Sequence, residues 1–499
     1  MPRAAADGAV AGIFLTAGLV ALSFAGWKLA GLPFAPFDVF DWIVRLLPGA
    51  LVTAVIDGSV AVSRAFGITN IDTAAKTGDQ VLALATVIVI GGFAGAMLFS
   101  ALFRSNEPAL LVGGILGAIL GGIVLIAERQ LLRLPPGSFV PGASVLVTFI
   151  AWGVALGWAC DRTKLSTAED AEGRRKFLKT LAAASLVVSA ASAAAGAIAS
   201  RIDRRFTGRR WSDEHPLPNA DVPVKPLPGT RTEFTPLEEF YRIDTDTRAP
   251  AIDADHWRLS IGGLVDRQQA LTLGDLHELE PTHLFATLCC ISNPPGGDLI
   301  STTRWTGVSL RRLLPRLGLQ SSATHLKVMS ADGFFESISL DVVRADDRVM
   351  LAYAWDGVPL PIEHGYPLRL YVPDLYGMKQ PKWIAGLDAT SHWEPGYWVA
   401  RGWSKDGIVA TMAAIDVVKA TEAGGVAFAG ARGISKVEVR VDEGQWQAAQ
   451  LRGPLSDLSW VVWRAELTAS PGGHVLAVRA VDAAGQTQPP PFHTRRFLL

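Results

Sequence analysis

Residues 287–293 read Thr-Leu-Cys-Cys-Ile-Ser-Asn and are followed by a loop rich in Pro and Gly. An apolar strand here delivers a thiol to a loop in which the backbone can approach a ligand closely. A soft thiolate is a suitable ligand for a redox metal, whereas a buried cysteine by itself is more often a small apolar residue. The chain has one further cysteine, Cys160, and no Cys-x-x-Cys spacing, so neither a disulfide framework nor a zinc site is expected. If a cysteine acts in this protein, it acts singly as a thiolate.

The composition of the chain changes sharply near residue 200, and 499 residues are enough for two or more domains. Hydrophobic residues make up 49% of the chain and charged residues 19%, which suits a protein with part of its mass in lipid. The net charge of −1 argues against a nucleic-acid partner, which would require a strongly basic surface. We therefore expect a membrane part before residue 200 and a water-exposed part after it.

The first 200 residues contain apolar runs of membrane-spanning length, roughly 20 residues each. These runs cover residues 8–30, 81–103, 108–127, 138–160 and 180–199. The third run carries Gly113, Gly117 and Gly121 at a four-residue spacing that lets helix backbones approach closely in lipid. Residues 1–200 are thus predicted to form a transmembrane helical region that serves as an anchor and docking surface.

The stretch 35–66 is also apolar, but charged residues and a proline interrupt it. These are Asp38, Asp41, Arg45, Pro48, Asp57 and Arg64. We favour an amphipathic or re-entrant segment at the membrane interface over a sixth span. Charged residues are few inside the five clear runs, so an ion or proton path, and with it a transporter, is poorly supported.

Histidine is missing from the first 200 residues, because all nine histidines lie between His215 and His493. A b-type haem embedded in a membrane normally needs paired axial histidine ligands. No haem is therefore expected in the helical region.

Residues 173–179 read Gly-Arg-Arg-Lys-Phe-Leu-Lys and lie at the start of the last apolar run. The pair Arg174 and Arg175, followed by Phe-Leu-Lys, looks like a twin-arginine signal, which addresses folded proteins to the twin-arginine export machinery. The alternative is a positive-inside flank on an ordinary membrane helix. Both interpretations place this cluster in the cytoplasm and everything after residue 200 on the extracytoplasmic side of the cell membrane.

The second half of the chain has the composition of a folded water-soluble protein. Residues 201–232 form a linker rich in Pro and Arg, which we expect to be extended and mobile. From residue 233 onward, short alternating strands, tight turns and short helical patterns such as residues 310–317 indicate an α+β fold.

Several motifs in this half have the order and spacing of one enzyme family. Leu288-x-Cys290-x-x-Asn293 resembles the sulfite oxidase segment in which a single cysteine binds molybdenum, and residues 301–310 resemble the Ser-Thr-x-Arg-Trp-x-Gly-x-x-Leu stretch of that family. The further matches are Leu351-Ala352-Tyr353, Pro359-Leu360-Pro361, His364-Gly365-Tyr366-Pro367-Leu368-Arg369, Val372-Pro373, Lys382-Trp383 and Ser391-His392-Trp393. The resemblance extends from about Phe240 to the C-terminus and implies a molybdopterin-binding oxidoreductase domain over residues 233–405.

The resemblance implies that Cys290, and not Cys289, is the molybdenum ligand, because its offset to Asn293 matches the family. Cys289 would then point away along the strand. Asn293 would take part in binding the cofactor. In the family mechanism an oxygen atom is transferred to or from the substrate at an oxo-molybdenum centre, and electrons then leave singly.

The resemblance also assigns cations to the cofactor. His364, Arg369 and Lys382 would hold the pterin and its phosphate, with a contribution from Arg304. This assignment agrees with their chemistry, since a dianionic phosphate group requires fixed cations and backbone donors.

Tyr353 and Arg242 match positions that line the substrate pocket of the family, where a hydroxyl and a guanidinium can bind an oxo group or an oxyanion. Two departures from the family pattern concern the same pocket. The family continues after its ligand cysteine with Gly-Asn-Arg-Arg, but residues 292–297 read Ser-Asn-Pro-Pro-Gly-Gly and lack that cation. The family's Arg-Asn-His near the start of the domain is Arg-Ile-Asp here, and Asp244 beside a bound sulfite would be repulsive.

The last part of the chain, residues 406–499, is predicted to be a β-sandwich. Residues 435–442, 460–467 and 474–482 alternate as strands separated by turns. Residues 427–434 resemble the start of the immunoglobulin-like domain that sulfite oxidases use for dimerisation, which implies a homodimer.

These observations together predict a membrane-anchored, molybdopterin-dependent oxidoreductase of the sulfite oxidase type, acting on a small oxyanion or a sulfoxide-like substrate. The alternatives are a sulfoxide-type reductase with the same cofactor and a non-catalytic membrane-anchored binding protein. The sequence contains no cytochrome or iron–sulfur motif, so we expect a separate electron-transfer partner, either a cytochrome or a quinone-linked protein.

Overall fold

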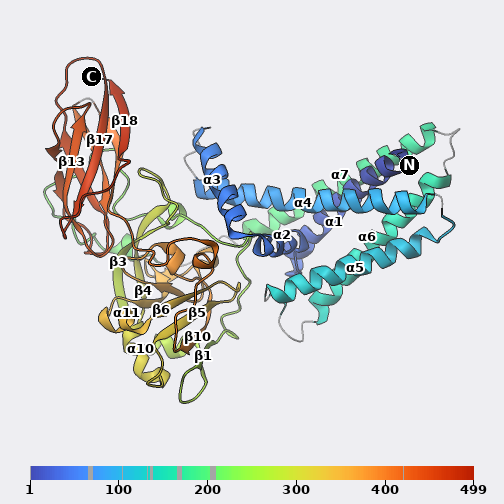
Figure 1. Ribbon diagram of the computed structural model, residues 1–499, viewed down its shortest axis with the longest axis horizontal. Helices are drawn as coiled ribbons and strands as arrows, with labels where there is room; N and C mark the ends of the chain where they lie inside the picture. Colours follow the sequence, from blue (N-terminus) through green and yellow to red (C-terminus); the bar gives the residue numbers. More distant parts are fainter. Residues whose placement is uncertain are drawn as a thin grey trace. The chain divides into compact units, whose positions relative to one another are not determined.

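The computed structural model describes residues 2–65, 71–103, 105–131, 133–134, 139–165, 171–202, 209–419 and 421–498. The chain divides into two compact units, which differ in secondary structure (Figure 1). The helical unit comprises Met1–Pro48, Ala75–Thr207 and Asp244–Arg248, and the β-rich unit comprises Gly49–Ala74, Gly208–Ile243 and Ala249–Leu499. The expected division near residue 200 is present, with two exceptions. Residues 49–74 belong to the β-rich unit, and residues 244–248 belong to the helical unit.

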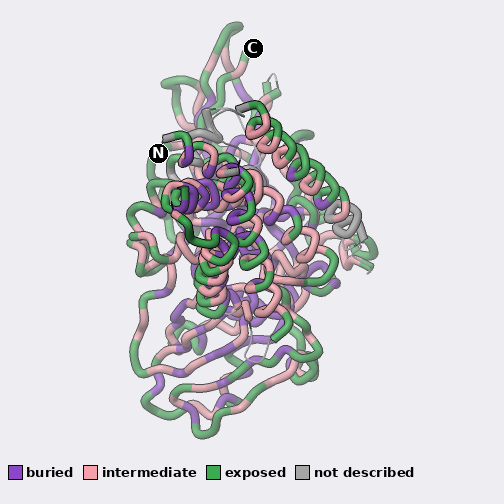
Figure 2. Tube along the Cα trace, turned by 90° about the vertical axis from the view of Figure 1, so that its right-hand side faces the viewer, coloured by how far each residue is buried: buried purple, intermediate pink, exposed green. Residues whose placement is uncertain are grey.

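The helical unit contains the long apolar helices. They are α1 (Pro2–Ala30), α4 (Ile71–Leu102), α5 (Ala109–Gln130), α6 (Phe139–Leu165) and α7 (Ala171–Ile202), and each is long and apolar enough to cross a membrane. Large apolar side chains are exposed along them, as expected of helices that face lipid (exposed residues are green in Figure 2); examples are Leu22, Val89, Phe93, Ile119 and Val147. The five predicted apolar runs are confirmed as helices.

The stretch 35–66 forms two helices instead of one. These are α2 (Ala35–Leu46) in the helical unit and α3 (Gly49–Ala65) in the β-rich unit. Their apolar content reaches that of a membrane span only when both are counted together as one broken helix.

Contacts between α1 and α4 define the relative direction of these two helices. Gly8 of α1 lies against Gly95 of α4, and Gly12 lies against Gly91. As the residue number rises on one helix, it falls on the other, so the two helices are antiparallel.

Contacts between α1 and α7 define a second direction. Asp7 pairs with Arg174 at 3.5 Å, and Gly18 lies beside Ser185. The residue numbers rise together, so α1 and α7 are parallel. An antiparallel α1 and α4 and a parallel α1 and α7 are expected if α1, α4, α5, α6 and α7 each cross a membrane once. An additional crossing between α1 and α4 would instead make these two helices parallel.

Helices α5 and α6 approach each other through glycines. A Cβ atom placed on Gly113 would lie 2.2 Å from the carbonyl oxygen of Gly153, and one on Gly117 would lie 2.2 Å from the carbonyl oxygen of Phe149. The packing role that the four-residue glycine spacing predicted is therefore confirmed. Gly122, on the same helix, has no neighbouring atom within 4 Å of such a Cβ position.

Two sheets form the first part of the β-rich unit. The first has the strand order β2-β1-β10-β5-β6, and the second has the order β3-β4-β7-β8 with β9 paired to β7. The strands are β1 (Leu259–Gly263), β2 (Gln269–Leu271), β3 (Thr282–Cys289), β4 (Ile300–Ser309), β5 (His325–Ser330), β6 (Phe335–Ser339), β7 (Met350–Trp355), β8 (Val358–Pro359), β9 (Arg369–Tyr371) and β10 (Ile384–Thr390).

Short helices cover the apolar core of this part. They are α9 (Leu273–His277), α10 (Leu310–Leu317) and α11 (Leu340–Ala345). Helix α10 begins where the Ser309 hydroxyl accepts the amide of Arg312, and it ends at Gly318, whose φ of 61° lies in the left-handed region that favours glycine. Its leucines at 310, 313 and 317 are buried in the core. The helix predicted over 310–317 and the α+β class are confirmed.

The C-terminal part is a sandwich of two four-stranded sheets. Their orders are β11-β12-β16-β15 and β14-β13-β17-β18. The strands are β11 (Met412–Lys419), β12 (Glu422–Phe428), β13 (Ile434–Val441), β14 (Gln447–Ala448), β15 (Gln450–Arg452), β16 (Val461–Glu466), β17 (Gly473–Asp482) and β18 (His493–Leu498). Side chains from both sheets, such as Ile415, Val439 and Trp463, share one apolar core. The predicted β-sandwich is confirmed.

The described end of the predicted linker is held in place by the sandwich. The Arg452 guanidinium donates to the carbonyl oxygens of Asn219, Val222 and Val224 and pairs with Glu233 at 2.9 Å. This buried ion pair fixes an extended segment, so mobility is not expected after Asn219. Residues 203–208 of the predicted linker lie outside the described residues.

The contact between α5 and α6 makes a prediction about stability. Gly113→Val should lower the midpoint of thermal unfolding in detergent, because the added side chain collides with backbone and overpacking costs about 1–3 kcal/mol. Gly122→Val is the matched control, since its side chain enters open space on the same helix. Equal midpoints for the two variants would contradict the packing of α5 on α6.

Candidate functional site

The two adjacent cysteines lie in different apolar clusters. Cys289 packs with Val409, Phe428 and Trp460, at the side of the C-terminal sandwich. Cys290 directly follows β3 and packs in a second cluster, whose rings belong to Phe240, Tyr241, Trp305, Trp355 and Tyr371 and which we call the aromatic cluster. The opposite orientation expected of neighbouring strand residues is confirmed.

Both thiols are buried, and burial raises the pKa of each above its ordinary value. The Ser292 hydroxyl lies 3.0 Å from the Cys290 sulfur and counteracts the increase in the pKa of Cys290 in part. The Cys290 amide donates to the carbonyl oxygen of Leu299 at 2.9 Å, which continues the pairing of β3 with the chain that leads into β4. Cys290 is therefore presented at a fixed position at the edge of the aromatic cluster.

The loop after Cys290 is closed by its own side chains and by residues far along the chain. The Asn293 amide oxygen accepts the Leu299 amide at 2.9 Å. Arg231 donates to the carbonyl oxygen of Gly297 at 3.2 Å, and the His493 ring lies against Gly296 so closely that a Cβ there would be 2.3 Å from the ring. Neither Arg231 nor His493 was identified from sequence, because only the fold brings them to this loop.

Two of the predicted cofactor cations border the aromatic cluster. His364 ends the short helix η2 (Ile362–His364), and its ring lies 4.5 Å from that of Trp355 and 5.5 Å from that of Phe240. Arg369 begins β9, with its guanidinium 4.9 Å from the centre of the Trp305 ring. It also donates to the carbonyl oxygen of His364 at 3.0 Å. Both side chains are buried, so the rings orient them in a space with little water.

Lys382 adjoins the same group through a glycine. Gly365, at a φ of 113°, packs against the side-chain bases of Arg369 and Lys382, where a Cβ would be 3.0 and 3.2 Å away. The Lys382 ammonium donates to the carbonyl oxygens of Ile243 and Glu363, each at 3.1 Å. The fold thus brings His364, Arg369 and Lys382 together, as the motif order predicted.

One buried nitrogen atom at this site, the indole Nε1 of Trp355, has no hydrogen-bond partner in the described part of the chain. Trp355 is fully buried within the aromatic cluster. A buried donor without a partner is unusual in a folded protein, and one explanation is that it donates to a bound ligand.

Tyr241 is a residue of this site that sequence analysis missed. It is stacked on Phe240, and its hydroxyl would be 3.1 Å from a Cβ on Gly377. Burial raises the pKa of Tyr241, the nearby Cys290 thiol raises it further, and Arg369 opposes both effects. Tyr241 thus responds electrostatically to both the thiol and the guanidinium of Arg369. The one sequence feature that could have identified Tyr241 is its position directly before Arg242.

Arg304 lies on the opposite face of β4 from Trp305. Its guanidinium stacks on Trp211 at 5.0 Å, and Trp211 in turn contacts Phe285 on β3. No described contact joins Arg304 to the aromatic cluster. The expectation that it contributes to the cofactor site is not supported by this position.

Tyr353 is also turned away from Cys290. It packs against the core beneath α10, and its ring lies 4.4 Å from that of His277 on α9. The pairing of β4 with β7 is irregular at this point, because Thr306 pairs with Ala354 while Gly307 pairs with Ala352. This bulge leaves Tyr353 unpaired and changes the alternation that sequence reasoning assumes. No described contact joins Tyr353 to Cys290, and its place in the substrate pocket stays a prediction.

Asp244 stands where the family pattern Arg-Asn-His has a histidine, near the predicted substrate pocket. The Asp244 carboxylate belongs to the helical unit, where it pairs with Lys76 at 3.3 Å and its side chain is fully buried. Its charge is therefore partly neutralised by a lysine, which weakens the expected repulsion of an anion. Arg242 lies two residues earlier, is half-buried and belongs to the β-rich unit.

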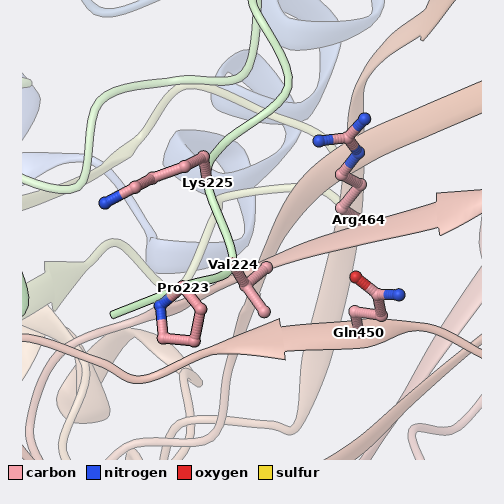
Figure 3. A pocket seen from close by; sticks show the side chains of 5 residues that line it. All are labelled: Pro223, Val224, Lys225, Gln450 and Arg464. Carbon is pink, nitrogen blue, oxygen red and sulfur yellow. The ribbon is translucent and has the colours of Figure 1, made fainter. Parts of the chain in front are cut away.

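A pocket of about 270 Å³ lies elsewhere in the β-rich unit (Figure 3). Its lining residues are Pro223, Val224, Lys225, Gln450 and Arg464. Lys225 donates to the carbonyl oxygen of Ala220, and Arg464 pairs with Glu422. Since both cations are engaged, we assign no chemistry to it. No group of three or more His, Cys, Asp or Glu side chains that could hold a metal occurs in the described ranges.

Comparison with known families matches both parts of the β-rich unit. Residues 246–398 match the model of the oxidoreductase molybdopterin binding domain. Residues 405–497 match the model of the Mo-co oxidoreductase dimerisation domain. The boundary between the two models falls close to the predicted domain boundary at residue 405.

Individual relatives agree with these models. The chain is 27% identical over 342 residues to mitochondrial sulfite oxidase of Rattus norvegicus, covering 57% of this chain and 62% of that enzyme. It is 30% identical over 155 residues to the uncharacterized oxidoreductase YuiH of Bacillus subtilis, covering 31% of this chain and 76% of YuiH. It is 29% identical over 187 residues to the putative protein-methionine-sulfoxide reductase subunit YedZ1 of Azospira oryzae, covering 38% and 68%. The chain thus spans less than two thirds of the length of the rat enzyme.

The His493 contact predicts a pH dependence of stability. Burial lowers the pKa of His493 below its usual 6.5, and the Ile415 amide donates to its Nδ1. The unfolded chain therefore binds a proton more readily than the folded chain, and His493 destabilises the fold as the pH falls below about 6.5.

Denaturant unfolding at pH 7.5 and 5.5 tests this effect. His493→Gln should lose less stability over this interval than the wild type, whereas a Gln variant of the exposed His256 should behave like the wild type. An identical pH dependence of the His493 variant and the wild type would show that the ring is not buried as described.

Proposed function

The chain belongs to the family of oxidoreductases with a molybdopterin-binding domain, and we propose that it transfers an oxygen atom at a molybdenum centre bound by the Cys290 thiolate. It is an enzyme that depends on the molybdenum cofactor. The ligand and the reaction are the parts that we propose. The observation that carries them is that Cys290 packs in the aromatic cluster whose rings also contact His364 and Arg369, which match the family's cofactor-binding positions.

The residues at this site fit the cofactor by their chemistry. A soft thiol suits molybdenum, and the buried His364 and Arg369 with the half-buried Lys382 suit a pterin with a phosphate. The unpartnered Nε1 of Trp355 is a donor for which a bound anionic group would supply an acceptor. With no cluster of protein metal ligands among the described residues, most ligands of the metal would have to come from the cofactor itself.

The chain's own residues have separate roles in this proposal. Cys290 holds the metal, while His364, Arg369 and Lys382 bind the pterin and its phosphate. Asn293 closes the loop next to the ligand through its bond to the Leu299 amide. When bound, the cofactor supplies oxygen-atom and electron chemistry.

For the substrate, we propose a small sulfur compound that approaches next to Arg242. In the sulfite direction, sulfite and water become sulfate with release of two protons and two electrons, and the electrons pass one at a time to two equivalents of a one-electron acceptor. Arg242 would bind the oxyanion, and the pairing of Asp244 with Lys76 reduces repulsion at this side.

Sulfoxide reduction is the second candidate. In this direction a sulfoxide takes up two protons and two electrons and becomes a sulfide and water. The segment after Cys290 lacks the cation with which the family binds sulfite, and the aromatic rings beside it suit an uncharged substrate. The match to a putative protein-methionine-sulfoxide reductase subunit supports the same direction.

We further propose a cell-membrane protein with five crossings and the β-rich unit on the extracytoplasmic side. The directions of α1, α4 and α7 support an odd number of crossings without α2 and α3. Arg174 and Arg175 at the start of α7 support a cytoplasmic location of that end and recognition by the twin-arginine export machinery. The C-terminal domain supports a homodimer, and electrons would pass to or from a separate cytochrome or quinone-linked partner.

Substrate assays on the molybdenum-loaded full chain in detergent distinguish the two directions. Sulfite with ferricyanide tests the oxidase, and methionine sulfoxide with a reduced viologen dye tests the reductase. If sulfite is the substrate, Arg242→Met should raise its KM by roughly ten- to a hundredfold with a smaller effect on kcat, because a charged hydrogen bond to the substrate is lost.

Arg344→Met is the control for this variant, since Arg344 is exposed and pairs with the nearby Asp341 on the same helix. Activity with methionine sulfoxide and none with sulfite would select the second candidate. Activity in neither assay, with molybdenum bound, would contradict both substrate proposals.

A further inference from the structure

Strand β3, which leads to Cys290, is the terminal strand of its sheet, and its outer edge is covered by a segment of the C-terminal part of the β-rich unit. The Thr287 amide donates to the carbonyl oxygen of Leu458 at 2.9 Å. The Thr287 hydroxyl accepts the amide of Trp460, also at 2.9 Å, and this bond is buried. Residues 458–460 therefore hold the strand three residues before Cys290.

The side chain of Cys289 continues this attachment to the C-terminal sandwich. Its thiol is buried in the apolar cluster that contains Val409, Phe428 and Trp460. Phe428 is the last residue of β12, so this cluster is part of the sandwich. The chain is thus attached to the sandwich up to the residue directly before Cys290.

Arg231 holds the loop that follows Cys290. Its Nη1 donates to the carbonyl oxygen of Gly297 at 3.2 Å. Its Nε and Nη2 both donate to the carboxylate of Asp416 on β11, at 2.9 and 2.6 Å, and the Arg231 amide donates to the same carboxylate at 3.1 Å. Because two parallel bonds to one carboxylate fix the plane of a guanidinium, the remaining donor is held toward Gly297.

The position of Asp416 follows from an irregularity in β11. The pairing of β11 with β12 skips Asp416, because Ile415 and Val417 pair with consecutive residues of β12. Asp416 is therefore the extra residue of a β-bulge, a feature that changes the direction of a side chain. Here the bulge makes the carboxylate available to Arg231.

His493, the first residue of β18, supplies a second contact to the same loop. Its Nδ1 accepts the Ile415 amide at 2.9 Å, so the ring is held by β11 and the proton of the neutral ring lies on Nε2. The ring lies against Gly296, where a Cβ atom would be 2.3 Å away and where φ is 81°. A larger residue at 296 would therefore displace the ring or the loop.

We propose that the C-terminal sandwich positions Cys290, because it holds the chain on both sides of this residue, over 287–289 and at 296–297. Thr287 and Arg231 are the positioning residues on the two sides. In this role the sandwich is a structural part of the metal site of its own chain, in addition to the dimerisation for which its family model is named. The inference rests on the proposed function in one respect, the assignment of Cys290 as the metal ligand.

Hydrogen exchange of the full chain in detergent tests the anchoring without requiring cofactor. Arg231→Met removes the donor to Gly297 and the ion pair with Asp416. Amide exchange over 290–299 should accelerate at least about tenfold, since hydrogen bonds from a charged group are lost. Arg464→Met is the matched control, because Arg464 pairs with Glu422 within the same sandwich. It should leave exchange over 290–299 at the wild-type rate.

Thr287→Val tests the attachment on the other side of Cys290. The substitution removes the hydroxyl that accepts the Trp460 amide and changes the shape of the side chain little. Exchange over 286–290 should accelerate, by a smaller factor than in Arg231→Met over 290–299. This variant also decides the anchoring if Arg231→Met does not fold.

The electron paramagnetic resonance signal of molybdenum(V) in the partly reduced protein is the second readout. A displaced sulfur ligand changes the g values of this signal, whereas a loss of folded protein lowers only its intensity. We expect altered g values in Arg231→Met and Thr287→Val, and wild-type g values in Arg464→Met.

Wild-type exchange rates in both positioning variants, or wild-type g values despite faster exchange, would overturn the positioning role. A wild type that holds no molybdenum would contradict the proposed function. In that case the exchange rates alone decide the anchoring, since acceleration in the two positioning variants supports it and wild-type rates overturn it.

Discussion

The contact between buried polar side chains and aromatic rings is the interaction on which the site depends. His364 and Arg369 are buried and would lose their hydration without favourable contacts in an apolar core. Trp305, Trp355 and Phe240 provide ring faces and edges that contact them. Because the same rings pack with Cys290, the thiol, the imidazole and the guanidinium all border one aromatic cluster.

Much of this arrangement was predictable from sequence, because spacing along strands carries information about orientation. The Cys-Cys pair illustrates this, since strand alternation separates Cys289 from Cys290 and the structure has them in different clusters. Motif order also selected His364 and Arg369 as cofactor-binding residues, and the fold brings both to the same rings. The α5 glycines were also assigned correctly, since their spacing has one physical use in a packed apolar helix.

What sequence could not give has equally physical causes. Tyr353 lies at a bulge, and an extra residue in a strand cannot be recognised from an alternating pattern. Arg304 neighbours Trp305 in the same motif, but alternation sends the two to opposite faces of β4, and Arg304 stacks on Trp211. Tyr241, Arg231 and His493 reach the site through contacts distant in sequence. The partners of Asp38 and Asp41 of α2, Arg248 and Thr247, lie far along the chain, so no local pattern reveals them.

The central claim is that Cys290 binds the metal of the molybdenum cofactor, and molybdenum content tests it most directly. Elemental analysis should compare the wild type with Cys290→Ser and with Cys289→Ser, a matched change at the adjacent thiol in a different cluster. The account predicts about one molybdenum per chain in the wild type and in Cys289→Ser, with loss of the metal or of its activity only in Cys290→Ser. Metal and activity that persist in Cys290→Ser, or a matured wild type without molybdenum, would contradict it.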